Sequence, residues 1–478
     1  MKSLLQNIKP AYIAGLLFLF NLFVKVLFIG SNQIDIDEPF SIYWAQAELN
    51  ELLGLFKDEN NPPAFFILLH FWIKIFGTSI WSVRFLPSLF ASLAVLFIFR
   101  TGTRFFNNFV AITASLLYTF SNIATYHSHD VRVYSMFIFL SSVSVYYLLR
   151  LYNQPTDKKA LAWWVVVNIL LAYSHFYAFL LLFFEFAFIL CNRQFRQKLL
   201  KPLFVLLGAI FLAYLPYAKL IILRFMSAKG GTWVEKPDFQ APYSRFVEFS
   251  NQPLTAVFFL LVIGFTLFLF VKRKTKISSP EWLIFLWFIA SFLFMFLISF
   301  KVPMFIPKYM VYILPGFYLS LSLLMSRISV WNKRTGLVVA GLAVLLMAAT
   351  SNLAEGNNRQ PKETADYVRG IMAENSVAIL CPPWLDLNFS YYYDMEMFND
   401  FGNVRQRLNG NNIYPVYDFK GIKPETLNRA ERVLFIDGWA QVSDPEGTIL
   451  SNLRRMFGKE EVVEFKGYKV FSFSQRRI

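Results

Sequence analysis

The chain has 478 residues, of which 56% are hydrophobic and 19% aromatic, and its mean hydropathy is +0.45. This composition excludes a soluble globular protein, and the repeated long apolar runs predict a polytopic membrane protein with helical spans. The net charge of +15 does not indicate nucleic-acid binding, because the basic residues form short clusters between the apolar runs. The two cysteines, Cys191 and Cys381, give no disulfide framework.

The first apolar run, residues 11–30, follows Lys2 and Lys9. No small-x-small cleavage site follows it, so we predict a retained first span and not a signal peptide. Ten further runs are long enough, or nearly so, to cross a hydrocarbon layer of ~30 Å. They lie near residues 84–100, 109–126, 134–150, 161–175, 177–192, 202–221, 254–271, 282–300, 309–326 and 335–350.

The basic clusters predict the orientation of these eleven spans. All five fall in alternate loops and therefore on the cytoplasmic side, together with the N-terminus. Loop 31–61 then lies outside, which fits its seven acidic residues and single lysine. The clusters are Arg100 and Arg104; Arg150, Lys158 and Lys159; Arg193, Arg196, Lys198 and Lys201; Lys272, Arg273, Lys274 and Lys276; and Arg327, Lys333 and Arg334.

The segment "PPAFFILLHFWIKIFG" (62–77) is apolar but short. A full crossing here would raise the count to twelve and would place all five basic clusters outside. We therefore predict that the segment is re-entrant or shares one crossing with the next run, and a short tilted span stays an alternative.

This topology gathers polar residues at the outer face. "YHSHDVRVY" (126–134), "YSHFY" (173–177), a loop at about 222–252 and "FKVPMFIPKYM" (300–310) all lie there. Charges at such depth are costly and are expected to line a cavity or to find a partner. Each residue alone is explained as an ordinary interfacial one, but the set on one face favours a functional site.

The stretch "SNQIDIDEPFSIYWA" (31–45) places Asp35, Asp37 and Glu38 where the chain leaves the first span. Apolar spacing from Pro39 to Phe56 predicts one amphipathic helix on the outer leaflet, with Pro39 in its first turn. Asp37 and Glu38 would then precede its N-terminus, so a helix cap is the simplest explanation. Capping needs only one carboxylate, however, and the stretch supplies two adjacent ones. Asp35 lies outside this pair and is expected to matter little.

A carboxylate at the outer interface can take the proton of an acceptor hydroxyl or amine. The cations Arg132 and Lys308 are suited to hold a leaving phosphate. An apolar groove between spans would accommodate a polyprenyl chain. These features together predict sugar transfer from a lipid-phosphate donor. No Gly-rich phosphate loop, HExxH helix or GxSxG elbow is found where it could act.

The sequence resembles glycosyltransferase family 39, which contains protein O-mannosyltransferases and lipid A aminoarabinose transferases, over about residues 10–330. "DEPFSIYWAQ" is similar to its Asp-Glu motif, and "NNPPAFFILLHFW" and the "RFLP" that follows are similar to its Pro-Pro and Arg-Leu-Pro segments. "YHSHDVRVYSM", "YSHFYAFLLL" and "FIPKYMVYILPGFYLSL" follow in the family's order. The resemblance implies the C-type membrane glycosyltransferase fold.

By this resemblance Asp37 is the catalytic base, with Glu38 beside it, and Arg132 and Lys308 meet the donor phosphate. Further candidates at the outer face are His129, Asp130, Tyr134 and His175. Lys308 stands where the family usually has arginine, and Asp130 stands where glutamate is common. Asn60 and Asn61 occupy the positions before Pro-Pro where some members carry an acid. A metal site is therefore not assigned; no cofactor is certain, and a divalent metal stays open.

The tail has no apolar span. "PKETADYVRGIMAEN" predicts an amphipathic helix, and "SVAILCPP", "RVLFIDG" and "KGYKVFSFS" predict strands. We expect a membrane domain over residues 1–350 and a small extracytoplasmic α/β domain over residues 351–478. Whether this domain guides the acceptor or only covers the groove is left open.

The sequence thus predicts a membrane glycosyltransferase that moves a sugar from a polyprenyl-phosphate donor to a lipid, glycan or protein acceptor, outside a bacterial inner membrane. Partners are these substrates and membrane lipid, not nucleic acid. One rival is a transporter or flippase of a lipid-linked or anionic substrate, against which no inverted repeat is evident and the charges lie away from mid-bilayer. A second rival is a non-catalytic membrane scaffold.

Overall fold

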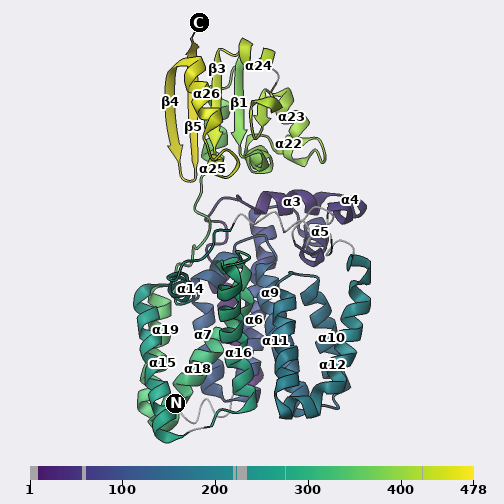
Figure 1. Ribbon diagram of the computed structural model, residues 1–478, viewed down its shortest axis with the longest axis vertical. Coiled ribbons are helices and arrows are strands. Elements are labelled where there is room, and N and C mark those ends of the chain that lie inside the picture. Colours follow the sequence, from purple (N-terminus) through teal and green to yellow (C-terminus); the bar gives the residue numbers. More distant parts are fainter. Residues whose placement is uncertain are drawn as a thin grey trace. The chain divides into compact units, whose positions relative to one another are not determined.

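The computed structural model describes residues 9–55, 61–218, 222, 234–274, 276–422 and 424–477 (Figure 1). The chain divides into two compact units. Unit 1 comprises Met1–Ile29, Leu53–Leu68 and Trp81–Glu355. Unit 2 comprises Gly30–Leu52, Leu69–Ile80 and Gly356–Ile478. The predicted division into residues 1–350 and 351–478 stays a prediction, while unit 2 adds to the tail two segments from the first eighty residues.

Unit 1 consists of helices, which Figure 1 shows as a bundle. Its helices are α2 (Pro10–Val26), α6 (Ile80–Phe105), α7 (Asn108–Thr119), α8 (Asn122–Ser128), α9 (Tyr134–Asn153), α10 (Lys158–Ala172), α11 (Ala178–Cys191), α12 (Arg193–Tyr214), η1 (Leu215–Tyr217), α14 (Ala241–Phe249), α15 (Pro253–Arg273), α16 (Ser279–Ser299), α17 (Pro307–Met310), η3 (Val311–Ile313), α18 (Leu314–Trp331) and α19 (Lys333–Ala349). Helix α5 (Ala64–Phe76) contributes residues to both units.

Each of the eleven predicted spans overlaps one of these helices, and the chain is a polytopic α-helical membrane protein. Among the described residues, six helical segments are long and apolar enough to cross a membrane, and the pair α7 and α8, bent by 61°, is a seventh candidate. The six are Ile80–Phe105, Tyr134–Asn153, Arg193–Tyr217, Pro253–Arg273, Ser279–Ser299 and Pro307–Trp331. Helices α2, α5 and α11 are apolar but shorter.

The short apolar segment 62–77 forms helix α5 (Ala64–Phe76). This helix has 13 residues, and at 1.5 Å per residue its length is about 20 Å, less than the ~30 Å of a hydrocarbon core. This length favours a re-entrant or shared crossing, which stays a prediction.

A buried polar cluster joins three helices of unit 1. Glu185 of α11 is 1% exposed, and its Oε1 lies 2.9 Å from the Ser144 hydroxyl of α9. That hydroxyl also lies 2.9 Å from Oδ1 of Asn168 on α10, whose Nδ2 donates to the Trp164 carbonyl oxygen at 2.7 Å. The single hydroxyl proton of Ser144 goes to Asn168, because Oδ1 can only accept. The contact between Glu185 and Ser144 therefore needs a proton on Glu185, so this side chain is a neutral acid.

Replacement of Glu185 by glutamine is expected to preserve stability, because an amide N–H donates to Ser144 as the protonated acid does. Replacement by alanine is expected to lower the free energy of unfolding by roughly 1–3 kcal/mol, since it leaves buried polar partners unpaired. Thermal unfolding of both purified variants in one detergent measures the difference. Equal losses in the two variants would contradict the assignment of a proton to Glu185.

Unit 2 contains a five-stranded sheet of order β2-β1-β3-β5-β4. Strand β1 (Ser376–Cys381) pairs in parallel with β2 (Ile413–Pro415) and β3 (Arg432–Asp437), while β5 (Tyr468–Arg476) runs antiparallel to β3 and to β4 (Phe457–Phe465). The register sets Val377 beside Val433 and Phe435 beside Phe471. The predicted small α/β domain is confirmed.

Helices cover both faces of this sheet. Alternate residues Val377, Ile379 and Cys381 of β1 join a buried cluster with Ile449 and Leu453, because successive side chains of a strand point to opposite faces. Helix α20 (Pro361–Ile371) contacts β5 and α21 (Asp386–Tyr393). The remaining elements are η4 (Pro383–Leu385), α22 (Met395–Asn399), α23 (Val404–Gly410), η5 (Phe419–Gly421), α24 (Pro424–Arg429), α25 (Ala440–Ser443) and α26 (Thr448–Met456).

The single helix predicted from Pro39 to Phe56 is wrong. The structure has two helices, α3 (Glu38–Gln46) and α4 (Leu49–Leu55), and Phe56 lies outside the described residues. The break falls at Ala47, whose backbone is extended at ψ 160°. The Glu51 carboxylate accepts the Glu48 backbone N–H at 3.2 Å and so caps the start of the second helix.

Candidate active site

Unit 1 contains a cluster of cations and aromatic rings that gathers several predicted residues. Arg132 lies in the turn between α8 and α9 and is 7% exposed. Its guanidinium carbon lies 5.6 Å from the centroid of the Phe66 ring of α5. The turn is tight, since the Arg132 backbone N–H donates to the Asp130 carbonyl oxygen at 2.7 Å. A mostly buried arginine at the end of a short helix is suited to bind a planar anionic group.

His175 lies in the loop between α10 and α11, and its ring stacks on Phe137 with centroids 4.8 Å apart and an interplanar angle of 7°. Its Nδ1 accepts the Tyr177 backbone N–H at 3.1 Å, so the proton of the neutral ring is on Nε2. Nε2 is buried and has no hydrogen-bond partner among the residues that the structure describes. A buried N–H donor in this state is expected to be satisfied by a ligand.

Both predicted cations act on this imidazole. Burial, followed by the charges of Arg132 and Lys308, lowers the pKa of His175 to about 3. Lys308 is the second residue of α17, and its Nζ lies 5.9 Å from the Tyr309 ring centroid. The Tyr309 ring in turn lies 6.0 Å from that of His175. Two cations therefore act on one neutral N–H donor, and an anion bound at this donor would be stabilised by their charges.

The other predicted candidates take different positions in unit 1. Tyr134 begins α9, with its ring 6.0 Å from His175 and 4.7 Å from His127. Asp130 lies 3.7 Å from Nδ1 of His127, which orients this pair. His129 has both ring nitrogens on backbone carbonyl oxygens, 2.6 Å from that of Lys25 and 3.0 Å from that of Glu355. The site can use Tyr134 directly, whereas the contacts of His129 favour a structural role.

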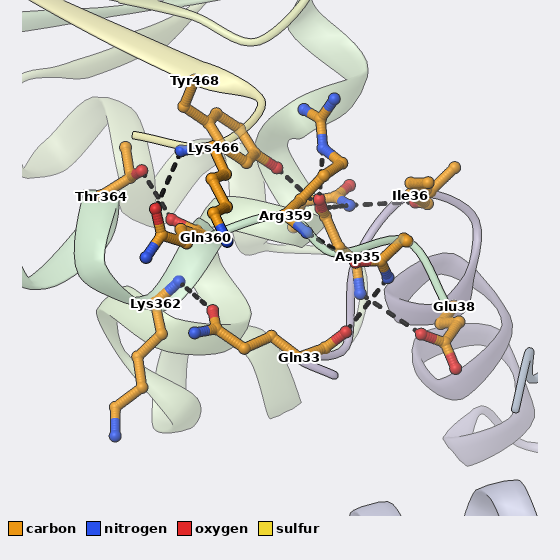
Figure 2. Close-up of polar contacts among 12 residues, drawn as sticks. Gln33, Asp35, Ile36, Glu38, Arg359, Gln360, Lys362, Thr364, Lys466 and Tyr468 are labelled. Carbon is orange, nitrogen blue, oxygen red and sulfur yellow. Dashed lines mark hydrogen bonds and ion pairs between the residues drawn. The ribbon is translucent and has the colours of Figure 1, made fainter. Parts of the chain in front are cut away.

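Residues 31–52 of the acidic loop belong to unit 2, and Asp35 is the most buried of their carboxylates. Asp35 is 1% exposed, although it was expected to matter little. Its Oδ2 accepts from Nε of Arg359 at 2.6 Å, and its Oδ1 accepts from Nδ2 of Asn388 and the Tyr468 hydroxyl, both at 2.7 Å (Figure 2). We call these four residues the Asp35 cluster. The expectation of a minor role is wrong, because removing one partner from a buried ion pair costs several kcal/mol.

Aromatic rings hold the arginine of the Asp35 cluster in place. The Arg359 guanidinium carbon lies 4.0 Å from the Trp439 ring centroid and 4.4 Å from that of Tyr468. Gly467, at φ +79°, closes the turn between β4 and β5, and a Cβ there would lie within 2.9 Å of Arg359 side-chain atoms. Burial, with the nearby Asp35 charge, raises the pKa of Tyr468 well above its ordinary value, so its hydroxyl remains a donor.

Ile36 connects the buried carboxylate to the predicted base. Its φ is +58°, which a β-branched residue adopts only at a cost of roughly 1–3 kcal/mol. The amide of Asn388 bonds both ends of this strained unit, donating to Oδ1 of Asp35 and to the Ile36 carbonyl oxygen at 3.0 Å. The surrounding contacts therefore fix the backbone immediately before Asp37.

Asp37 precedes α3 and is half-buried. Its side chain makes no capping hydrogen bond to the helix, while its carbonyl oxygen accepts the Ser41 backbone N–H at 3.2 Å. Glu38 is the first residue of α3 and is 3% exposed, and its Oε2 accepts the Asp35 backbone N–H at 3.4 Å. The Asp37 carboxylate therefore does not cap α3, although a helix cap was the simplest explanation of the acidic pair.

The described residues contain no group of three or more His, Cys, Asp and Glu side chains that could hold a metal ion. Asp58, Glu59 and Asn60 lie outside them. We derive no step through a metal.

Sequence reasoning missed the three partners of Asp35, because Arg359, Asn388 and Tyr468 are more than 320 positions away along the chain. Phe66 and Tyr309 were also missed. Their only signal was an aromatic ring near a predicted cation, and Tyr309 directly follows Lys308.

The comparisons with known proteins agree with this description. Residues 60–218 match the model of the family described as dolichyl-phosphate-mannose-protein mannosyltransferase. A comparison with curated protein sequences found no match. The fold is similar to that of ArnT from Cupriavidus metallidurans in the apo state, with TM-score 0.61 and 12% identity over 97% of this chain and 98% of that one.

Two more solved structures share the fold. ArnT bound to undecaprenyl phosphate has TM-score 0.59 and 9% identity over 97% of both chains. The oligosaccharyltransferase AglB from Archaeoglobus fulgidus, with an inhibitory peptide and a dolichol-phosphate, has TM-score 0.53 and 12% identity over 97% of this chain and 74% of that one. The predicted resemblance and the C-type membrane glycosyltransferase fold are confirmed.

Proposed function

We propose that this protein is an integral-membrane glycosyltransferase that transfers a sugar from a polyprenyl-phosphate donor to a lipid, glycan or protein acceptor. The observation that carries the proposal is the unsatisfied, buried Nε2–H of His175, with Arg132 and Lys308 acting on the same ring. Such a group of donors is suited to a phosphate. The structure also has helices that are long and apolar enough to cross a membrane, and a polyprenyl chain needs such apolar surroundings.

The proposed reaction needs one base and one set of anion ligands. Asp37 takes the proton of the acceptor hydroxyl or amine, whose freed electron pair forms a bond to the anomeric carbon of the sugar. The bond between that carbon and the phosphate oxygen breaks, and polyprenyl phosphate leaves with the electron pair. Arg132, Lys308 and His175 stabilise its added negative charge. Glu38, the second predicted catalytic residue, lies beside this base and tunes or orients it.

Solved structures of the same fold support this choice of donor. One was obtained with undecaprenyl phosphate and another with a dolichol-phosphate and a peptide. We infer that this chain takes a donor of the same lipid-phosphate class.

The experiment uses the purified protein in liposomes with a panel of undecaprenyl-phosphate hexoses and pentoses and an extract of envelope lipids. Release of undecaprenyl phosphate, together with a glycosylated product, supports the proposal. A transporter or flippase, the main rival, would move the intact lipid across the bilayer without cleaving it. Movement without cleavage would therefore overturn the enzyme proposal.

We also propose that the N-terminus is cytoplasmic, and that loop 31–61 and the tail lie outside a bacterial inner membrane. Single cysteines introduced at Ser31 and at Asn352 in a chain lacking Cys191 and Cys381 are expected to react with an impermeant maleimide in intact cells. A cysteine at Arg193 is expected to react only after lysis, because a basic cluster remains in the cytoplasm. Labelling of only one of the two outer positions would contradict the count of eleven spans.

A further inference from the structure

The segment that carries the acidic loop packs with the tail domain. Gly30–Leu52 belongs to the same compact unit as Gly356–Ile478. Tyr43 of this segment stacks on Phe401 and accepts the Gly402 backbone N–H at 2.6 Å.

Two further sets of hydrogen bonds, at Gln33 and at Asp35, join the same segments. The first is exposed, with Gln33 donating to both Glu363 oxygens at 2.7 and 2.9 Å. Gln33 also accepts the Lys362 backbone N–H at 2.8 Å (Figure 2). The second is the Asp35 cluster, in which every carboxylate contact is buried.

A contact that only holds the two segments together would need neither a buried ion pair nor a strained backbone. Apolar residues of similar volume often stabilise a packed contact as well as a buried ion pair does. The Asp35 cluster instead places a buried charge next to a residue in a disfavoured conformation, Ile36 at φ +58°. One amide, that of Asn388, bonds to both, and the next residue is Asp37. Strain that the surroundings over-determine is typical of functional loops.

We propose that the Asp35 cluster is a positioning device by which the tail domain fixes the direction of the Asp37 carboxylate. Asp35, Asn388 and Tyr468 are then positioning residues that act through the Ile36 backbone. This role rests on the function proposed for Asp37. The tail domain would then contribute to the reaction by orienting the base, in addition to covering the groove or guiding the acceptor.

The chain offers a test that separates positioning from stability. Ile36→Gly removes the strain, because glycine adopts positive φ freely, so the thermal unfolding temperature is expected to stay the same or to rise. The same change frees the backbone before Asp37, and kcat is expected to fall roughly ten- to hundred-fold with the KM for the donor unchanged. Ile36→Asn is expected to restore kcat, because asparagine tolerates this conformation while restricting it more than glycine.

A second variant loosens the cluster from the tail domain. Tyr468→Phe removes one hydrogen bond to Asp35 but keeps the ring over Arg359. We expect a similar fall in kcat and faster hydrogen exchange at the backbone amides of residues 35–38. Gln33→Ala is the matched control, because it breaks the exposed contact of the same segment and is expected to change neither quantity.

The outcomes distinguish this inference from the proposed function. Normal kcat in Ile36→Gly and Tyr468→Phe, in a protein that Asp37→Asn inactivates, would overturn the positioning role while leaving the function intact. If the wild-type protein cleaves no donor of the panel, the proposed function fails. Hydrogen exchange then still tests the positioning role. Exchange at residues 35–38 no faster in Tyr468→Phe than in Gln33→Ala would then overturn the positioning role.

Discussion

Replacement of Asp37 by asparagine is expected to lower the turnover of a polyprenyl-phosphate sugar by a factor on the order of 10²–10⁴ without unfolding the protein. Asparagine has nearly the shape of aspartate but cannot take the proton of the acceptor. The fold is expected to be kept, since asparagine before a helix caps about as well as aspartate. Turnover and thermal unfolding of the purified variant are measured together.

A matched control is available eleven residues after Asp37. Glu48 is exposed and begins the turn into α4, so Glu48→Gln removes one acidic charge from the same unit and should leave turnover unchanged. Glu38→Gln should give an intermediate loss, because Glu38 is buried and accepts the Asp35 backbone N–H. If Asp37→Asn retains normal turnover, the reaction proceeds without this base and the proposed mechanism is wrong.

The membrane-spanning part was predictable because its physics is local. A bilayer requires long apolar helices whose backbone bonds lie within one segment, so a hydropathy pattern is enough to find them. Each predicted span overlaps an observed helix for this reason. The cluster around His175 was also partly accessible, since Arg132, Tyr134 and Lys308 were all selected as residues of one face.

The acidic loop shows where sequence reasoning ends. Nothing near Asp35 indicates that it is buried, because its partners come from the loop before α20, from α21 and from β5. The strain at Ile36 was equally hidden, since a β-branched residue is expected at negative φ. Both features depend on contacts between segments more than 320 positions apart, which no local pattern records.

Two strands of the tail were missed for a different reason. Strand β4 reads "FGKEEVVEF" and is largely exposed because it forms the edge of the sheet, so it lacks the alternation expected of a half-buried strand. Strand β2 has only three residues. The three strands that were predicted, β1, β3 and β5, occupy the centre of the sheet, where burial makes the sequence strongly apolar.

Replacement of Arg132 by alanine is expected to weaken donor binding roughly ten- to hundred-fold, since a charge-assisted contact to phosphate is worth roughly 1.5–3 kcal/mol. Lys308→Ala should act similarly. Lys308→Arg should retain function, because it keeps the positive charge that acts on His175. Native mass spectrometry or thermophoresis with undecaprenyl phosphate as the probe measures the affinities.

Lys301 supplies the control for these variants. It is an exposed cation seven positions before Lys308, in the loop that links α16 to α17, and Lys301→Ala should leave the affinity for undecaprenyl phosphate unchanged. A general attraction between a basic surface and an anionic lipid would instead weaken with each lost charge, and more so at low salt. Salt-independent losses confined to Arg132→Ala and Lys308→Ala are therefore expected of a built phosphate site. Unchanged affinity in both alanine variants, with folding intact, would reject that site and with it the assignment of the leaving group.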